Sequence, residues 1–229
     1  MQYILTRSKR KTIALSFDGD GNLCVKAPFR VSKRVIEAFL DEKKEWIEAT
    51  AVRLKNQRIK EAAERMQLDN GDVLFYLGEA LTITVIRENR QRGKVVRVND
   101  RLILTVPYAA DYTYKKNLLE KWFRREAAEV LQRKAAEFAK LLSVSYEDIK
   151  IKDQKSRWGS CSSKGNLNFN FRIIMAPEKV CDYVVKHELC HLVYLDHSEA
   201  FWSLLTSIHP ETAECRRWLK ENSKKLYPF

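Results

Sequence analysis

The sequence of 229 residues predicts an α+β fold with two regions. Segments with alternating apolar residues, typical of strands, are separated by turn residues in the first half of the chain. Two long segments instead repeat apolar residues at helical spacing, and three shorter helical segments close the chain. Pro107 interrupts the pattern, so we expect a β-rich region with a long helix at residues 1–108 and a second domain at residues 109–229.

The first region is expected to contain two groups of strands with a helix between them. Residues 2–29 are expected to form a β-hairpin around the turn sequence DGDGN at 18–22. Ser32 is a candidate N-cap for one long helix that covers residues 32–67. Short turns that contain Gly or Asn separate the second group of strands, which is expected at residues 73–78, 81–88, 94–98 and 101–106.

The second domain is expected to combine a long helix, two strands and three shorter helices. The long helix covers residues 111–142. A strand at 146–153 and a polar turn lead to the segment NLNFNF at 166–171, which alternates polar and apolar side chains as a strand does. The chain is expected to end with helices at residues 177–195, 199–208 and 211–224.

The composition is that of a globular protein with a basic balance of charge. The 42 Lys and Arg residues against 30 Asp and Glu give a formal net charge of +12, which indicates either a polyanionic partner, such as a nucleotide or nucleic acid, or a solvated basic surface. The five cysteines are odd in number and widely spaced, which favours reduced thiols over a disulfide framework. Neither a transmembrane run nor a signal-type segment is seen, so a cytoplasmic protein is expected.

Three of the four histidines fall within the segment HELCHLVYLDH. His187 and His191 are four residues apart in a segment expected to be helical, so both imidazoles lie on one helix face. Two neutral imidazoles in this arrangement can bind one zinc ion, and Glu188 beside the first is placed to act as a general base rather than as a ligand. The alternative is a pair of histidines on an amphipathic helix with a solvated glutamate. Apolar residues on both sides of the motif favour the metal site, because buried polar side chains need partners.

A third ligand has two possible sources. His197 lies six residues after His191, and the histidines match the metzincin spacing H-E-x-x-H-x-x-G-x-x-H, although Tyr194 stands at the glycine position and no Met-turn follows. The rival is a glutamate further along the chain, Glu211 or Glu214. We expect His197, because three histidines and a water complete a catalytic zinc site.

Two further segments contain candidates for substrate contacts. Arg157 in RWGSC is a candidate to stabilise a developing oxyanion or an anionic substrate group, and its alternative is a structural ion pair. Gly159 next to it is expected to permit an unusual turn. Tyr194 is another possible oxyanion donor, with packing on the helix face as its alternative.

The strand NLNFNF places Asn166, Asn168 and Asn170 on one face. In zinc proteases such a strand lines the cleft and the substrate adds to it as a further strand. The alternative for Asn166 and Asn168 is a half-exposed strand with a polar face, and Asn170 is a candidate contact through the family resemblance described below. Asp182 and Asp196 are candidates to hydrogen-bond the far nitrogen of a ligating histidine.

The segments RWGSCSSKG, NFNFRIIMAP, DYVVKHELCHL and HSEAFW resemble those of the YgjP-like metallopeptidase family, and the resemblance covers nearly the whole chain. That family is similar to the SprT-like and WLM zinc proteases, whose third histidine stands in a pattern H-x-x-x-F, here His197 to Phe201. The resemblance implies a zincin-type, minigluzincin-like catalytic core behind an N-terminal β-rich region. It also implies the ligands His187, His191 and His197, the base Glu188 and a motif asparagine at Asn170.

The sequence is interpreted as that of a cytoplasmic zinc metallopeptidase. It would bind one Zn²⁺ per chain and hydrolyse peptide or protein substrates with a metal-bound water activated by Glu188. One alternative is a metal-dependent hydrolase of nucleotide phosphoanhydrides, although no P-loop is present. Another is a DNA-associated binding protein with a structural or regulatory metal, whose affinity would fall with salt. A structural site normally has four protein ligands, which makes that alternative the weaker one.

Overall fold

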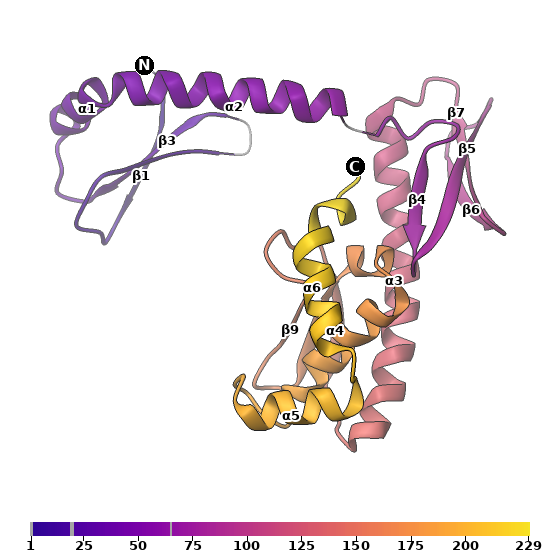
Figure 1. Cartoon of the computed structure of the whole chain (residues 1–229). Coiled ribbons are helices and arrows are strands. Elements are labelled where there is room, and N and C mark those ends of the chain that lie inside the picture. Colours follow the sequence, from indigo (N-terminus) through magenta and orange to yellow (C-terminus); the bar gives the residue numbers. More distant parts are fainter. Residues whose placement is uncertain (1, 19–20, 65) are drawn as a thin grey trace. The chain divides into compact units, whose positions relative to one another are not determined.

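The computed structural model describes residues 2–18, 21–64 and 66–229, with the backbone alone for 57–64. The chain divides into two compact units, Met1–Arg65 and Met66–Phe229, and each contains helices and strands, which confirms the α+β class (Figure 1). Within the described part of the chain, every helix falls short of the length or apolarity that crossing a bilayer requires.

The first unit is a three-stranded sheet followed by two helices. The expected hairpin lies between β2 and β3, which are antiparallel, whereas β1 pairs with β3 in parallel; residues 19 and 20 of its turn lie outside the described residues. Alternate residues of β3 are buried with Ile36, Leu40 and Ile47 of the helices. The elements are β1 (Ile4–Ser8), β2 (Ala14–Phe17), β3 (Leu23–Pro28), α1 (Lys33–Glu42) and α2 (Lys44–Glu64).

The single helix expected over residues 32–67 is divided at Lys43 into α1 and α2. Ser32 is the N-cap of α1, as expected, because its side chain accepts a hydrogen bond from the backbone N–H of Val35. Neither proline nor glycine stands near the division, so the sequence gives no signal for it. The stretch between Glu64 and residue 67 contains Arg65, which lies outside the described residues.

The second unit begins with a four-stranded sheet in the order β4-β5-β7-β6, and its strands agree closely with those expected. Leu81 and Ile83 of β5 are buried with alternate residues of β7, and they share one core with Trp122 and Phe123 of the long helix α3. This sheet therefore belongs with α3, and the unit starts at Met66 rather than after residue 108. The elements are β4 (Val73–Tyr76), β5 (Glu79–Glu88), β6 (Lys94–Val98), β7 (Arg101–Pro107) and α3 (Tyr112–Leu142).

The rest of the second unit is a three-stranded sheet with helices on it, beside the second half of α3 (Figure 1). The expected strand NLNFNF is the central strand β10, parallel to β8 and antiparallel to β9, which lies in the stretch expected to be a turn. The elements are β8 (Asp148–Lys152), β9 (Gly159–Cys161), β10 (Asn166–Asn170), η1 (Phe171–Met175), α4 (Glu178–Cys190), α5 (Glu199–Ile208), α6 (Thr212–Asn222) and η2 (Ser223–Leu226).

A buried lysine joins α4 to α3. The side chain of Lys134 on α3 is 5% exposed, and its Nζ lies 2.7 Å from Glu178 and 2.6 Å from Asp182, both on α4. A buried charge is tolerated only when it is paired, so this pair of carboxylates fixes the two helices against each other.

We predict that residues 66–229 fold without the first unit. This segment has its own continuous core and is long enough to bury it without help from a second domain. The isolated segment is expected to unfold in one cooperative thermal transition, measured by circular dichroism. A segment from residue 109 to 229, which lacks the β4–β7 sheet, is the control and should fail to do so. Non-cooperative unfolding of 66–229 would contradict the division into two units.

Candidate metal centre

Helix α4 places the first two histidines of the motif. The helix begins at Glu178 after Pro177, and most of its residues between Val180 and Cys190 are buried. His187 lies in its last turn and His191 is the residue at its C-cap, so the helix ends before residue 195, where it was expected to end. Their imidazole rings are one turn apart on the same face, with centroids 5.0 Å apart.

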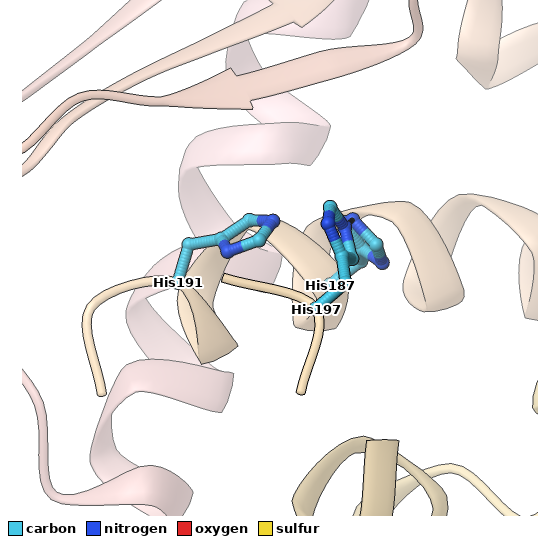
Figure 2. Close-up of side chains that lie close together, drawn as sticks. All are labelled: His187, His191 and His197. Atoms are coloured by element: carbon cyan, nitrogen blue, oxygen red, sulfur yellow. Dashed lines mark hydrogen bonds between the residues drawn. The ribbon is translucent and has the colours of Figure 1, made fainter. Parts of the chain in front are cut away.

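The segment after α4 brings His197 to the same place. Its Nε2 lies 3.1 Å from Nε2 of His187, and the ligand atoms offered by the three histidines all lie within 4.8 Å of one another (Figure 2). The two Nε2 atoms can form a hydrogen bond only if one of them carries a hydrogen. A cation between the rings would instead be bound by the lone pairs of both atoms. The spacing of these nitrogen atoms fits a single metal ion.

The protonation of the rings also fits a metal ion. The backbone carbonyl of Tyr194 lies 3.0 Å from Nδ1 of His191 and can only accept, so Nδ1 carries a hydrogen and Nε2 is the nitrogen available to a metal ion. Burial and the neighbouring imidazoles lower the pKa of His187 to about 3, and burial also lowers the pKa of His197. Both are then neutral, as metal ligands must be. Nδ1 of His187 is buried and finds no hydrogen-bond partner among the residues that the structure describes.

Aromatic rings from the start of α5 surround the three imidazoles. The ring of Phe201 is fully buried, and its centroid lies 5.0 Å from His187, 4.6 Å from His191 and 4.8 Å from His197. Trp202 stacks on His197 at 5.5 Å. The sequence pattern marked Phe201 only as part of a motif, and the structure gives it contacts with all three rings.

The two aspartates expected to orient the histidines are engaged elsewhere. Asp182 pairs with Lys134, and Asp196 accepts a hydrogen bond from the backbone N–H of Ser198 at 3.2 Å. The carbonyl of Tyr194 is found in the position expected for one of them. A backbone group leaves no signal in the residue types, so the sequence did not indicate it.

Glu188 lies beside the histidines but inside the protein. It is 6% exposed, and burial raises the pKa of its carboxyl to about 8, while the charge of Arg157 and a backbone hydrogen bond from Cys161 act in the opposite direction. A cavity of about 230 Å³ opens at this carboxyl. It is lined by Arg157, Trp158, Gly159, Tyr183, Val184, His187, Glu188 and Leu219.

Arg157 and Tyr194 lie at the site, whereas Asn170 is part of the fold. Arg157 is exposed, lines the cavity and acts electrostatically on Glu188. Tyr194 is 37% exposed in the segment between His191 and His197.

Asn170 is fully buried. Its Oδ1 accepts from the N–H of Arg172, and its Nδ2 donates to the carbonyl of Gln154 at 2.6 Å and to the hydroxyl of Tyr227 at 3.1 Å. Its strand β10 is the central strand, so β8 and β9 form the edges of this sheet. Of these two edge strands, β9 is the one that contacts α4.

Two other expectations are resolved by the structure. Gly159 lies in β9 and is not among the residues with positive φ, so the expectation of an unusual turn there is wrong.

The rival ligand Glu214 forms an ion pair with Lys179, and Glu211 is an exposed residue at the start of α6. Neither glutamate belongs to the group of possible ligands formed by the three histidines among the described residues.

One comparison with known proteins, the match to a family model, agrees with this chemistry. Residues 11–222 match the family model described as YgjP-like, metallopeptidase domain, so the match spans both compact units. A search of the curated proteins gives no match. Among solved structures, the chain is similar to the metallopeptidase zymogen abylysin of Pyrococcus abyssi, with 20% identity and a TM-score of 0.37 over 40% of this chain and 93% of that chain.

We predict that Phe201→Leu weakens the affinity for a metal ion, tested with Zn²⁺, by about tenfold, because groups that orient metal ligands contribute 10–100-fold to metal affinity. The leucine fills most of the space but loses the ring contacts with the three imidazoles. The measurement is competition with a chromogenic chelator. Leu205→Ala, in the same helix, controls for general loss of packing and should lower stability with little effect on affinity. Wild-type affinity in Phe201→Leu would contradict the orienting role.

Proposed function

Because the chain belongs to the YgjP-like metallopeptidase family, and is a metal-dependent peptidase, we propose that His187, His191 and His197 bind one zinc ion and that Glu188 is the general base. The observation that carries this proposal is the convergence of three imidazoles beside a buried carboxyl. Three nitrogen ligands leave one position of a tetrahedral zinc site open, which distinguishes a catalytic from a structural site.

A bound zinc ion would supply a Lewis acid that polarises a water molecule and the carbonyl of the scissile bond. The ionised form of Glu188, which burial opposes and the charge of Arg157 favours, accepts a proton from the attacking water at one of its Oε atoms and then donates it to the amine of the leaving peptide. The low exposure of Glu188 keeps bulk water from competing for this proton. Arg157 favours the ionised form of Glu188, so we assign it a role in preparing the base.

The substrate is proposed to be a peptide or protein in an extended conformation. β9 is an edge strand and contacts α4, so a peptide can pair with backbone groups of β9 that neither β10 nor Glu188 engages, and pass over Glu188 and the histidines. The adjoining cavity contains apolar walls from Val184 and Leu219 and can receive one side chain. Tyr194, exposed on the segment between two of the histidines, is proposed as a further contact.

We predict that Glu188→Gln abolishes most hydrolysis but leaves the metal bound. The amide keeps the shape of the side chain and cannot accept the proton, so hydrolysis of fluorophore-labelled casein should fall by about 10²–10⁴-fold. Metal content is measured on the same preparation by mass spectrometry and should equal that of the wild type. Glu199→Gln, an exposed glutamate of α5, is the matched control. Undiminished hydrolysis by Glu188→Gln would place the chemistry at another residue, and loss of metal would make Glu188 a structural residue.

A second prediction distinguishes the two sources of the third ligand. His197→Ala should weaken Zn²⁺ binding by more than about 100-fold, the upper end of the effect of groups that only orient ligands. Glu211→Ala should bind Zn²⁺ as the wild type does, because Glu211 is exposed and outside the cluster. Titration with a competing chelator measures both. The opposite pattern, with metal lost in Glu211→Ala and kept in His197→Ala, would replace His197 with the glutamate.

A further inference from the structure

We infer that Gly159 is a positioning residue, which holds the carboxylate of Glu188 in place because it has no side chain. The inference rests on the proposed function, in which Glu188 is the base. Gly159 lies where strand β9 contacts helix α4. Its backbone conformation does not require a glycine, so the reason for a glycine at this position is sought in the contact.

The backbone of Gly159 lies directly against the side chain of Glu188. A Cβ atom built on Gly159 would lie 2.5 Å from Oε1, 2.6 Å from Cγ and 2.7 Å from Cδ of Glu188. Carbon atoms in contact prefer a separation of about 3.5–4.0 Å, so no other residue fits here without a shift. The glycine does not adopt positive φ, so the requirement is for space and not for backbone freedom.

Neither partner can move away without a cost. β9 is held on its other side by β10, where Gly159 is paired with the fully buried Phe169 and the N–H of Asn170 donates to the carbonyl of Trp158 at 2.8 Å. On α4, the crowded atoms of Glu188 include Cγ as well as the carboxylate, so a small rotation of the terminal group would not relieve the contact. The side chain would have to adopt a different rotamer, which displaces the carboxylate.

The same strand also acts on the carboxylate through its backbone. The backbone of Cys161, two residues after Gly159, favours the ionised form of Glu188. The close approach of β9 at Gly159 brings this backbone near the carboxylate. The contact at Gly159 and the backbone of Cys161 therefore act on the same side chain.

The first test is the activity of Gly159→Ala, alone and combined with Glu188→Gln. The single variant should keep its Zn²⁺, measured by chelator competition, and lose casein hydrolysis by about 10²-fold, the effect of a misplacement near 1 Å. In the Glu188→Gln background the same substitution should cause little further loss, because both changes act through one carboxylate. Gly93→Ala, at a glycine where a Cβ atom would be crowded against Leu118 of α3 instead of Glu188, is the control and should keep wild-type activity. Full activity of Gly159→Ala, loss of zinc, or losses that multiply in the double variant would overturn the inference.

The second test does not use activity. Overpacking at Gly159 is expected to lower the melting temperature by about 2–10 °C, and this decrease should disappear in a Glu188→Ala background, where the crowded atoms are absent. A decrease that persists in that background would overturn the inference. A crystal structure of Gly159→Ala should show the carboxylate of Glu188 displaced, and an undisplaced carboxylate would also overturn it. If instead Glu188→Gln alone retains full hydrolysis, the proposed function fails while these two measurements still report on the contact.

Discussion

Helix α4 contacts α3, α5, α6, β9 and η1, so its side chains are enclosed on nearly every side. A helix in such a position must be apolar almost throughout, and each polar side chain that it carries needs a partner inside the protein. Asp182 has Lys134, whereas, among the described residues, Nδ1 of His187 has no hydrogen-bond partner, and Glu188 is influenced by the backbone of Cys161 and by the charge of Arg157. His187 and Glu188, the two polar side chains of α4 with the least compensation, are therefore neighbours in the chain and both line the cavity.

Two other buried charges differ from these groups, because each has carboxylate partners. Arg172 is 3% exposed, pairs with Asp153 at 3.2 Å and with Glu120 at 3.4 Å, and lies over the rings of Phe171 and Tyr227. Lys134 is paired twice. Breaking such a pair by removing one partner is strongly destabilising, so these residues serve the fold. Perturbed groups without a full set of partners are instead typical of sites that bind or transform a ligand.

Local sequence signals predicted most elements because each one agreed with its tertiary environment. The four strands between residues 73 and 107 alternate as the buried face of their sheet requires, and α3 has both its periodicity and an N-cap at Asp111. The division at Lys43 and the parallel pairing of β1 carry no local signal, since neither depends on a turn residue or a period. The short strand β9 was missed because its sequence is that of a turn, and only pairing with β10 makes it extended.

The sequence predicted the part of the site that lies within one helix, but not the contacts that distant elements make. Spacing within one helix is a local property, so the positions of His187, Glu188 and His191 followed from the sequence. The burial of Asn170, the pairing of Asp182 and the contact between Gly159 and Glu188 depend on elements that are distant along the chain. Residue types alone could not separate these from substrate contacts, histidine partners or a turn glycine.

His197 differs from the other two histidines in what holds it. It is the most exposed of the three and comes from a segment of turns and bends rather than from a helix. Its ring is kept in place by stacking on Trp202 and by contact with Phe201, so its position depends on how α5 packs. A metal ion bound by all three imidazoles would join the end of α4 to the start of α5. Because a ligand that binds only the folded state stabilises it, the metal would strengthen this otherwise lightly held connection and complete the site at the same time.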